Sequence, residues 1–228
     1  MQDLTLVIPA KYESESLPIF LNEIKEFSCQ KIVVLDESDK ETINSIKHFE
    51  NIEILYQKKK GYGAALIEGI SHTSTIFFCI INADGSMNPE YVDKMLFKVK
   101  EKNLDFLFAS RYEHPSGGSD DDNLTTLLGN FLFTKIGNLF FSLKISDILF
   151  TYVLGKTKSF NDLSLSSKNF TLCVEFPIEV KRKKLKYDTI PSYERSRIGG
   201  KKKVNAFKDG LLILFKMIRM FFNKWKKK

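Results

Sequence analysis

Short apolar runs alternate with segments of helical length through the first half of the chain. The apolar runs predict strands, because near-continuous apolarity suits a sheet that helices cover on both faces. They occupy residues 4–9, 31–36, 52–56, 75–81 and 105–111, and the segments between them predict helices near 15–27, 39–48, 62–72 and 88–102. This alternation is typical of an α/β fold with a mostly parallel sheet and right-handed crossovers.

The residues that follow each predicted strand form the candidate site, because ligands of such sheets bind beyond the carboxyl ends of the strands. Acids, basic residues and glycines gather there: Pro9 to Glu13, Asp36 and Glu37, Lys58 to Gly61, Asn82 to Asp84, and Arg111. Taken singly, Asp36 or Asp84 could cap a helix and the lysines could be solvated. Jointly, five such strand ends favour a site for a nucleotide diphosphate and a divalent cation.

Composition and charge narrow the class of protein. The chain has 228 residues, of which 43% are hydrophobic, enough for one sizeable core. Residues 201–228 hold ten Lys or Arg and one acid, so the remainder carries a net charge of about −2. Three widely spaced cysteines suggest neither a disulfide framework nor a zinc site and favour a reducing, cytosolic environment. We expect no secretory signal, and no apolar run reaches the ~18 residues of a membrane span.

Six motifs in a fixed order carry a resemblance to a known family. They are VIPAKYE, VLDESDKET, KGYGAALIEGI, NADGSMNPE, ASRYEHPSGG and PSYERSRIGGKKKV. In this order the chain resembles the inverting GT-A glycosyltransferases, and among them the dolichol-phosphate or polyprenyl-phosphate mannosyl- and glucosyltransferases, to about residue 210. The resemblance implies an α/β GT-A fold, the Rossmann-like fold of nucleotide-diphospho-sugar transferases, with a mostly parallel sheet flanked by helices.

The resemblance also implies a metal site. The NADGS stretch stands where the family has D-x-D, so Asp84 is the expected ligand of Mg²⁺ or Mn²⁺ and Ser86 a further polar ligand. Asn82 replaces the first acid of the motif, with Ala83 between them. An amide can hydrogen-bond a hydroxyl but brings no charge, so we expect weaker metal retention without nucleotide. A degenerate, inactive site is the alternative.

By the same resemblance, Pro9, Glu13 and Asp36 line the nucleoside pocket, and Lys60 and Gly61 lie near the nucleotide or sugar. Arg111 is the expected donor-side cation, since a guanidinium can grip phosphate oxygens in bidentate fashion. Its structural alternative is a salt bridge at a strand end. Arg195 and Arg197 would form a second cationic cluster, with Lys203 beside it.

The acceptor decides what chemistry the site needs. A phosphate monoester has a second pKa of about 6, so a polyprenyl phosphate is already anionic and needs no general base. Arg197 with Lys201 to Lys203 could hold it in line. A hydroxyl acceptor would need a base, for which His114 and Asp147 are candidates. His114 stands beside Pro115 and is more typical of a surface loop, whereas Asp147 matches an acceptor-side acid of the family.

Two segments have compositions suited to lipid. Residues 124–145 are rich in Leu and Phe, and a buried core helix is the simpler interpretation. Residues 204–228 predict a basic amphipathic helix, distinct from a glycosyltransferase domain over 1–203. At 100° per residue, Lys208, Lys216, Arg219 and Lys226 fall within an arc of about 80°. Trp225 and Lys226 to Lys228 would suit the headgroup level. Packing onto the domain or a partner is the alternative.

The resemblance, together with these observations, predicts a metal-dependent, inverting hexosyltransferase. The donor would be a nucleotide sugar of the GDP-mannose or UDP-glucose type, and the acceptor a polyprenyl or dolichyl phosphate. We expect a cytoplasmic protein, peripheral at an anionic membrane surface, with no nucleic-acid partner; the sequence leaves its oligomeric state open. A transferase acting on a soluble or glycan hydroxyl is a second enzyme hypothesis, and a non-catalytic sugar-nucleotide binder or membrane scaffold is a hypothesis of another class.

Overall fold

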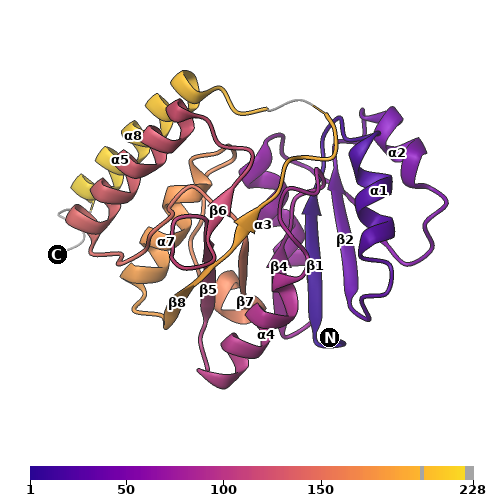
Figure 1. The fold of residues 1–228 in the computed structure, drawn as a ribbon, viewed down its shortest axis with the longest axis horizontal. Coiled ribbons are helices and arrows are strands. Elements are labelled where there is room, and N and C mark those ends of the chain that lie inside the picture. The colour runs from indigo at the N-terminus through magenta and orange to yellow at the C-terminus, as the bar shows by residue number, and fades with distance from the viewer. Residues whose placement is uncertain (201–202, 224–228) are drawn as a thin grey trace.

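A seven-stranded sheet forms the centre of the structure, a computed structural model that describes residues 1–200 and 203–223. The strand order is β3-β2-β1-β4-β7-β5-β8, and β7 alone in this sheet is antiparallel to its neighbours. The strands are β1 (Leu4–Pro9), β2 (Gln30–Leu35), β3 (Glu53–Tyr56), β4 (Phe77–Ile80), β5 (Phe106–Ser110), β7 (Val153–Lys156) and β8 (Tyr187–Pro191). The predicted α/β fold with a mostly parallel sheet is confirmed (Figure 1).

Helices cover both faces of this sheet, which explains the continuous apolar runs of its strands. Leu6 and Ile8 of β1 pack into one core with α1, α2 and α4, whereas Val7 between them packs into a second core with α3, α6 and α7. The helices are α1 (Ser16–Glu23), α2 (Lys40–Ile46), α3 (Tyr62–His72), α4 (Tyr91–Glu101), α6 (Thr157–Asn161) and α7 (Leu172–Arg182).

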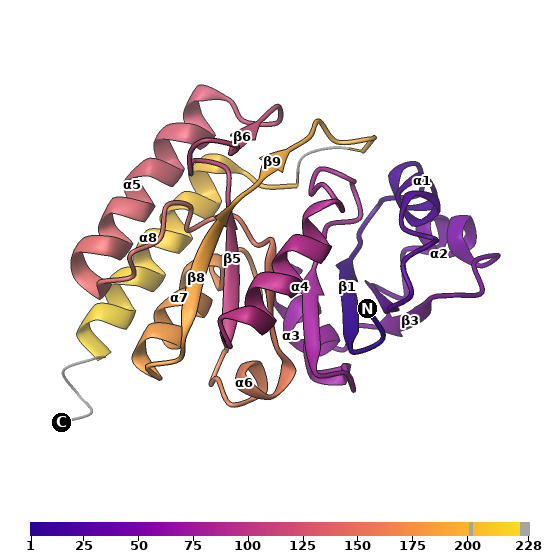
Figure 2. The ribbon, with the colours of Figure 1, turned by 60° about the horizontal axis from the view of Figure 1, so that its bottom comes forward.

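A small second sheet lies beyond the end of β8. Strands β6 (Gly118–Ser119) and β9 (Tyr193–Glu194) pair in parallel, and Met87 bridges to Glu194. Figure 2 shows β9 continuing the line of β8, and the Arg195 N–H after β9 donates to the carbonyl of Ser86, in the turn that follows β4. This sheet therefore brings the segment after β9 over the carboxyl edge of the main sheet.

Two long helices form a third layer outside α7. α5 (Leu124–Phe141) and α8 (Ala206–Asn223) run side by side (Figure 1), and Phe221 of α8 stacks edge-on against Phe140, with ring centroids 5.5 Å apart. Ile213, Met217 and Met220 of α8 are buried in a core that includes residues of α5 and α7. The alternative that α8 packs onto the domain is thus realised for one of its faces.

A second face of α8 and the adjoining face of α5 stay exposed and apolar. We call this surface the α5–α8 apolar face; it consists of Leu124, Leu128, Phe131, Leu132 and Leu139 of α5 with Phe207, Leu211, Phe215, Ile218 and Phe222 of α8. The exposed Lys135, Lys208 and Arg219 lie among them. Lys216, expected on the polar arc, instead turns inward and contacts Glu175 of α7 at 2.7 Å.

Within the described residues, no helix combines the length and apolarity that crossing a bilayer requires. Trp225 and Lys226 to Lys228, which were expected at headgroup level, lie outside the described residues, as do Lys201 and Lys202. The proposed division of the chain at residue 203 stays a prediction.

Candidate active site

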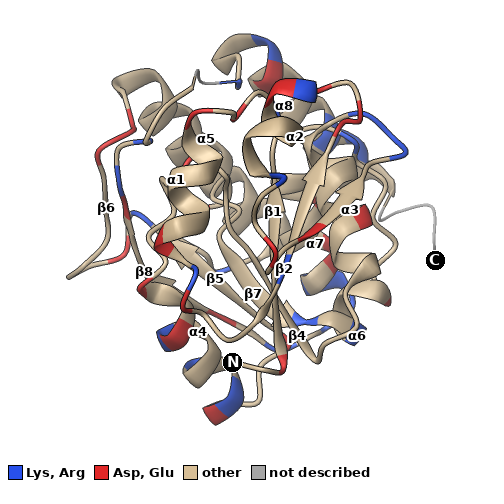
Figure 3. Cartoon of the chain, turned by 90° about the vertical axis from the view of Figure 1, so that its right-hand side faces the viewer, with Lys and Arg blue, Asp and Glu red and all other residues tan. Residues whose placement is uncertain are grey.

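The carboxyl ends of β2, β1 and β4 lie next to one another in the sheet, so the residues after them meet at one edge. Glu13 follows β1, Asp36 follows β2, and Asn82 and Asp84 follow β4. Figure 3 shows blue and red segments in the loops beyond β1 and β2, whereas the strands are mostly tan. The sequence prediction that these residues share one edge is confirmed.

A tight turn positions Asp84. Its Oδ1 accepts from the backbone N–H of Ser86 at 3.1 Å, and Gly85 between them has φ 74°, a conformation that favours glycine. The segment after β9 lies on this turn: the Ile198 N–H donates to the Asp84 carbonyl and the Arg195 N–H to the Ser86 carbonyl, both at 2.8 Å. Asp84 is therefore held by backbone contacts, and Ala83 before it is buried.

Arg197 stands between two acids at this turn. Its Nη1 lies 3.6 Å from Asp84 Oδ2, and its Nη2 lies 3.0 Å from Asp121 Oδ2. Partial burial acts to lower the pKa of Arg197, but the hydrogen bond that Arg197 donates to Asp121 and the charge of Asp84 outweigh it and hold the pKa above its usual value. The expected second cationic cluster thus contacts the predicted metal-binding acid directly, through Arg197.

Asn82 contacts a buried hydroxyl rather than a charge. The Tyr62 hydroxyl, at the start of α3, donates to Asn82 Oδ1 at 3.1 Å and lies 2.5 Å from Thr151 Oγ1. The first position of the motif is thus tied to α3 and to the segment before β7.

The nucleoside-side candidates occupy the loops after β1, β2 and β3. Glu13 is buried and accepts from Ser16 Oγ at 2.5 Å and from Lys203 Nζ. Asp36 accepts from the Ser38 hydroxyl and N–H, which lower the pKa of this carboxyl. Lys60 Nζ lies 3.8 Å from Asp36 Oδ2, and the Lys60 side chain is 86% exposed, so this cation is open to solvent.

The remaining residues of that group line the same edge. Pro9 ends β1 and is buried, and Gly61 precedes α3. The buried Asp39, which the sequence analysis passed over, accepts from the Tyr12 N–H at 2.6 Å and caps α2. Asp39 thereby fixes the loop that carries Glu13.

The geometry corrects the expected role of Arg111. Its Nε donates to Asp147 Oδ2 at 2.7 Å and its Nη2 to Asp147 Oδ1 at 3.1 Å, while Nη1 donates to Glu194 at 3.0 Å. Burial acts to lower the pKa of Arg111, yet Asp147 and Glu194 hold it above its usual value. The guanidinium fork is therefore used by carboxylates, as in the salt-bridge alternative, and not left open to a donor phosphate.

The same contacts correct the expectation for Asp147. Its side chain is 0% exposed and both oxygens accept from Arg111, so it is not available to an acceptor as a base. Arg195 also has a structural role: its guanidinium contacts both oxygens of Glu23 and donates to the Gly85 carbonyl at 2.7 Å. Arg195 therefore braces the Asp84 turn against α1 rather than facing an acceptor. His114 is exposed on a loop, as expected.

Two contacts of the site escaped the sequence analysis. Asp121 lies in the acidic run before α5, and nothing in its spacing marks it as the partner of Arg197, which is 76 residues away. Tyr62 lies inside the glycine motif, of which only Lys60 and Gly61 were expected near the nucleotide or sugar. The run of three acids from Asp120 to Asp122 was the available signal for Asp121.

The described residues of the chain offer few ligands for a metal ion at the Asp84 turn. Among the described residues, no three His, Cys, Asp or Glu side chains group as ligands of one ion. Asp84 supplies one carboxylate, and Ser86, whose side chain was an expected ligand, is 2% exposed. Arg197 beside Asp84 shows that this position accommodates a cation. The residues present thus fit an ion that receives its other ligands from a bound diphosphate.

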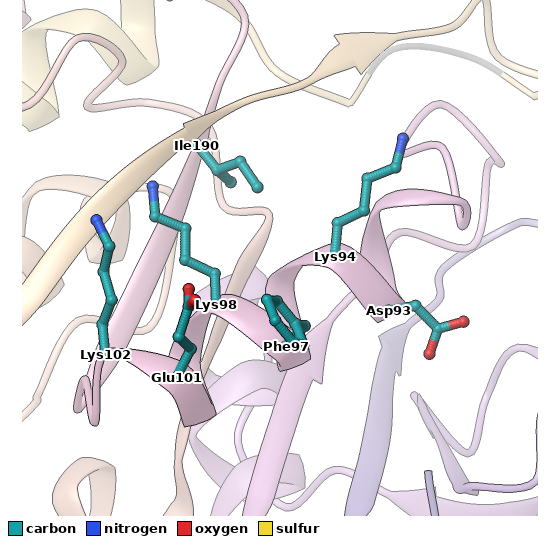
Figure 4. A pocket seen from close by; sticks show the side chains of 7 residues that line it. All are labelled: Asp93, Lys94, Phe97, Lys98, Glu101, Lys102 and Ile190. Atoms are coloured by element: carbon teal, nitrogen blue, oxygen red, sulfur yellow. The ribbon is translucent and has the colours of Figure 1, made fainter.

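A hollow of about 500 Å³ lies elsewhere, on the outer surface between α4 and β8. Figure 4 shows Phe97 and Lys98 on α4, Lys102 directly after this helix, and Ile190 on β8. Lys98 and Lys102 both pair with Asp188, at 3.2 and 2.9 Å. Because none of the strand-end residues line this hollow, the candidate active site is at the carboxyl edge instead.

Comparison with known proteins agrees with this geometry. The family described as glycosyl transferase family 2 matches residues 5–164. The glycosyltransferase AglJ of Haloferax volcanii is 20% identical over 218 residues, covering 94% of this chain and 70% of the relative. The uncharacterized glycosyltransferase Mb0553 of Mycobacterium bovis is 26% identical over 108 residues, covering 47% of this chain and 48% of the relative.

Solved structures show the same fold. Glucosyl-3-phosphoglycerate synthase of Mycobacterium tuberculosis, crystallised with Mn²⁺, UDP and phosphoglyceric acid, superposes with a TM-score of 0.69 at 12% identity, covering 96% of this chain and 78% of that one. A complex of that enzyme with Mg²⁺ and UDP gives a TM-score of 0.68 at 12% identity, covering 95% of this chain and 78% of that one. With a family match over well more than half of its length, this chain belongs to glycosyl transferase family 2 and is a glycosyltransferase of the GT-A fold.

Proposed function

We propose that this glycosyltransferase moves a hexose from a nucleotide sugar, of the GDP-mannose or UDP-glucose type, to a polyprenyl phosphate at the cytosolic face of a membrane. One observation carries the proposal: the loop whose Asp121 contacts Arg197 leads directly into α5, where the α5–α8 apolar face begins at Leu124. An acceptor with its phosphate at Arg197 can therefore lay its apolar chain along that face.

The donor half of the proposal rests on the Asp84 turn. A leaving nucleoside diphosphate develops negative charge, which a divalent cation neutralises. Asp84 would hold Mg²⁺ or Mn²⁺ together with the diphosphate oxygens, as the Mn²⁺ and UDP complexes of glucosyl-3-phosphoglycerate synthase suggest by analogy. Glu13 and Asp36 would accept from nucleoside hydroxyls, and the exposed Lys60 would approach a phosphate.

The acceptor half follows from the absence of a suitable base among the described candidates. Asp147 is committed to Arg111, and His114 is exposed on its loop. A phosphate monoester needs no base, because its second pKa of about 6 leaves it largely anionic at neutral pH. Arg197 would exchange Asp121 for the acceptor phosphate and hold it in line with the leaving group, which inverts the anomeric carbon.

The proposed membrane association rests on the α5–α8 apolar face. Ten large apolar side chains gathered on two adjacent helices are a larger exposed apolar surface than a soluble domain needs. Lys135, Lys208 and Arg219 lie among them, and basic side chains around an apolar face suit an anionic lipid surface. We propose peripheral association through this face, on the cytosolic side.

A second candidate is transfer to a soluble phosphorylated acceptor. It is favoured by the phosphoglyceric acid complexes of glucosyl-3-phosphoglycerate synthase, whose fold this chain shares. The same Arg197 would hold the acceptor's phosphate, but a hydroxyl nucleophile would then need a base. Transfer to a glycan hydroxyl, and donor binding without turnover, remain the weaker alternatives because neither accounts for the α5–α8 apolar face.

The deciding experiment offers GDP-mannose and UDP-glucose to the full chain with Mn²⁺ or Mg²⁺. The acceptors are a short polyprenyl phosphate, phosphoglycerate and a simple glycan, and the product is detected by mass. We expect transfer to the polyprenyl phosphate, its loss in Asp84→Asn, and in Arg197→Gln a raised KM for the acceptor with donor affinity retained. Transfer to phosphoglycerate alone would establish the second candidate, and nucleotide-sugar binding with no product for any acceptor would reject both.

A further inference from the structure

Three side chains from distant parts of the sequence form one hydrogen-bonded row that ends at Asn82. Asn82 Oδ1 can only accept a hydrogen bond, so the Tyr62 hydroxyl donates its single proton to that oxygen, at 3.1 Å. The hydroxyl of Thr151, 2.5 Å from the Tyr62 oxygen, must then donate to it. The direction of the row is therefore fixed: Thr151 donates to Tyr62, and Tyr62 donates to Asn82.

The middle member of the row is held rigidly. The ring of Tyr62 stacks on that of Phe170, with centroids 5.0 Å apart and planes 24° apart. The preceding Gly61 has φ 121°, and a Cβ there would lie 2.1 Å from the Lys168 carbonyl oxygen, so the backbone fits closely against that loop. Burial raises the pKa of Tyr62, which keeps its proton in place at all physiological pH values.

We propose that Thr151 and Tyr62 are positioning residues that lock the amide of Asn82 in one orientation, with its oxygen turned to the protein and its NH₂ group left for the nucleotide sugar. This inference rests on the proposed donor. Asn82 then donates a hydrogen bond to an oxygen of the donor, a sugar hydroxyl or a diphosphate oxygen, beside the carboxylate of Asp84. An aspartate at this position could only accept.

The row therefore explains how an amide can occupy the first position of the motif. A free amide can turn either its oxygen or its NH₂ group toward the nucleotide sugar. In the first of these two orientations, the amide oxygen would face an oxygen of the nucleotide sugar, and no hydrogen bond could form. Locking the amide removes the unfavourable orientation before the donor binds, so no free energy is spent on selecting it. A carboxylate has two equivalent oxygens, so the same row could add no orientation to Asn82→Asp.

The test compares Tyr62→Phe in two backgrounds. Tyr62→Phe keeps the ring stacked on Phe170 and removes only the hydroxyl. In the natural chain we expect affinity for the nucleotide sugar, measured by calorimetry with Mn²⁺, to fall about five- to ten-fold, with kcat at saturating donor little changed. In the Asn82→Asp background the same substitution should change affinity by less than about two-fold, because the symmetric carboxylate has no orientation to lose.

Two further variants separate positioning from general structural damage. Thr151→Val should weaken donor binding in the same direction, and Thr151→Ser should restore it. Tyr152→Phe is the matched control, because its buried hydroxyl also donates one hydrogen bond, to the Asn88 carbonyl at 2.9 Å, away from the row. It should lower the melting temperature without changing donor affinity.

Equal losses from Tyr62→Phe in both backgrounds would overturn the inference and make Tyr62 a structural residue. Unchanged donor affinity in Tyr62→Phe would overturn it as well. If the natural chain binds no nucleotide sugar, the proposed function fails first, and the inference fails with it. The two failures are thus distinguishable from the first titration.

Discussion

Replacing Arg111 by Met tests whether this residue holds the site together or grips a phosphate. The guanidinium is 10% exposed and lies against Asp147 and Glu194, whose side chains are 0% and 9% exposed. Arg111→Met would leave both carboxylates without their cation. Removing one partner of a buried ion pair costs about 3–5 kcal/mol, which for a chain of this size lowers the melting temperature by on the order of 10 °C.

The assay is thermal unfolding followed by circular dichroism, together with donor titration at a temperature where the variant is folded. The control is Lys102→Met, which removes the cation of an exposed pair: Lys102 is 50% exposed and its partner Asp188 is 36% exposed. That pair should contribute less than about 1 kcal/mol. The double variant Arg111→Met with Asp147→Asn should recover part of the lost stability, because one uncompensated carboxylate is removed.

Arg111→Lys sharpens the comparison. A lysine keeps the charge but cannot donate to both oxygens of Asp147 and to Glu194 at once. The melting temperature of Arg111→Lys should therefore lie between those of the natural chain and Arg111→Met. The reasoning is refuted if Arg111→Met has the same melting temperature as the natural chain while its affinity for nucleotide sugar drops. That result would return Arg111 to the donor-phosphate role that the sequence motif predicted.

Two other predictions concern α8. Burial acts to raise the pKa of Glu175, but Lys216 and neighbouring donors outweigh it and hold the pKa low. The resulting stability is present above the ordinary glutamate pKa of about 4.3 and is lost as the pH falls through the lower pKa of the folded state. Below about pH 5, the melting temperature of the natural chain should therefore fall more steeply than that of Glu175→Gln. Parallel curves would contradict this. Phe215→Asp, at a position 65% exposed, should abolish flotation with phosphatidylserine vesicles without changing the melt, whereas Met217→Asp, at a position 1% exposed, should unfold the third layer. Flotation of Phe215→Asp equal to that of the natural chain would remove the α5–α8 apolar face from the membrane proposal.

The first five strands could be predicted because each contains a short run of mostly apolar residues. Residues 4–9 form β1 over the same range, and the other four predicted strands agree with the structure to within a few residues. The signal is strong in β1, β2, β4 and β5 because helices cover both faces and nearly every position is buried, whereas the edge strand β3 has no buried position. Their strand-end residues followed from topology alone, since parallel neighbours end at one edge.

The later part of the chain gave weaker signals for physical reasons. Strand β8 is an edge strand whose five positions are all half-buried, so it lacks a continuous apolar run. Helix α7 contains Pro177 in its interior, a residue that usually ends a helix. Strand β7 has four residues and runs antiparallel to its neighbours. An alternation of strands and helices predicts only parallel strands.

The site residues also differ in how well the sequence predicted them, depending on whether their surroundings are local or come from distant parts of the chain. The place of Asp84 at the carboxyl edge was correctly expected, because its position after β4 is a local property of the chain. Its role as a metal ligand stays a prediction. The role of Arg111 was not correctly expected, because its partners Asp147 and Glu194 are 36 and 83 residues away and only the fold brings them together. A motif identifies a residue type at a strand end; the distant carboxylates decide whether its charge is free for a substrate.

Charge balance at the Asp84 turn links the amide of Asn82 to the cation of Arg197. Two carboxylates, Asp84 and Asp121, face this one guanidinium, at 3.6 and 3.0 Å. An acid at position 82 would add a third negative charge where a diphosphate must also bind, whereas the amide adds a hydrogen-bond donor. In the proposed function, Arg197 would leave these acids for an acceptor phosphate, and Asp84 would then face a divalent ion bound with the donor. The proposed function would thus couple donor and acceptor binding through Arg197, because the guanidinium that contacts Asp84 and Asp121 in this structure would hold the acceptor phosphate once the donor is bound.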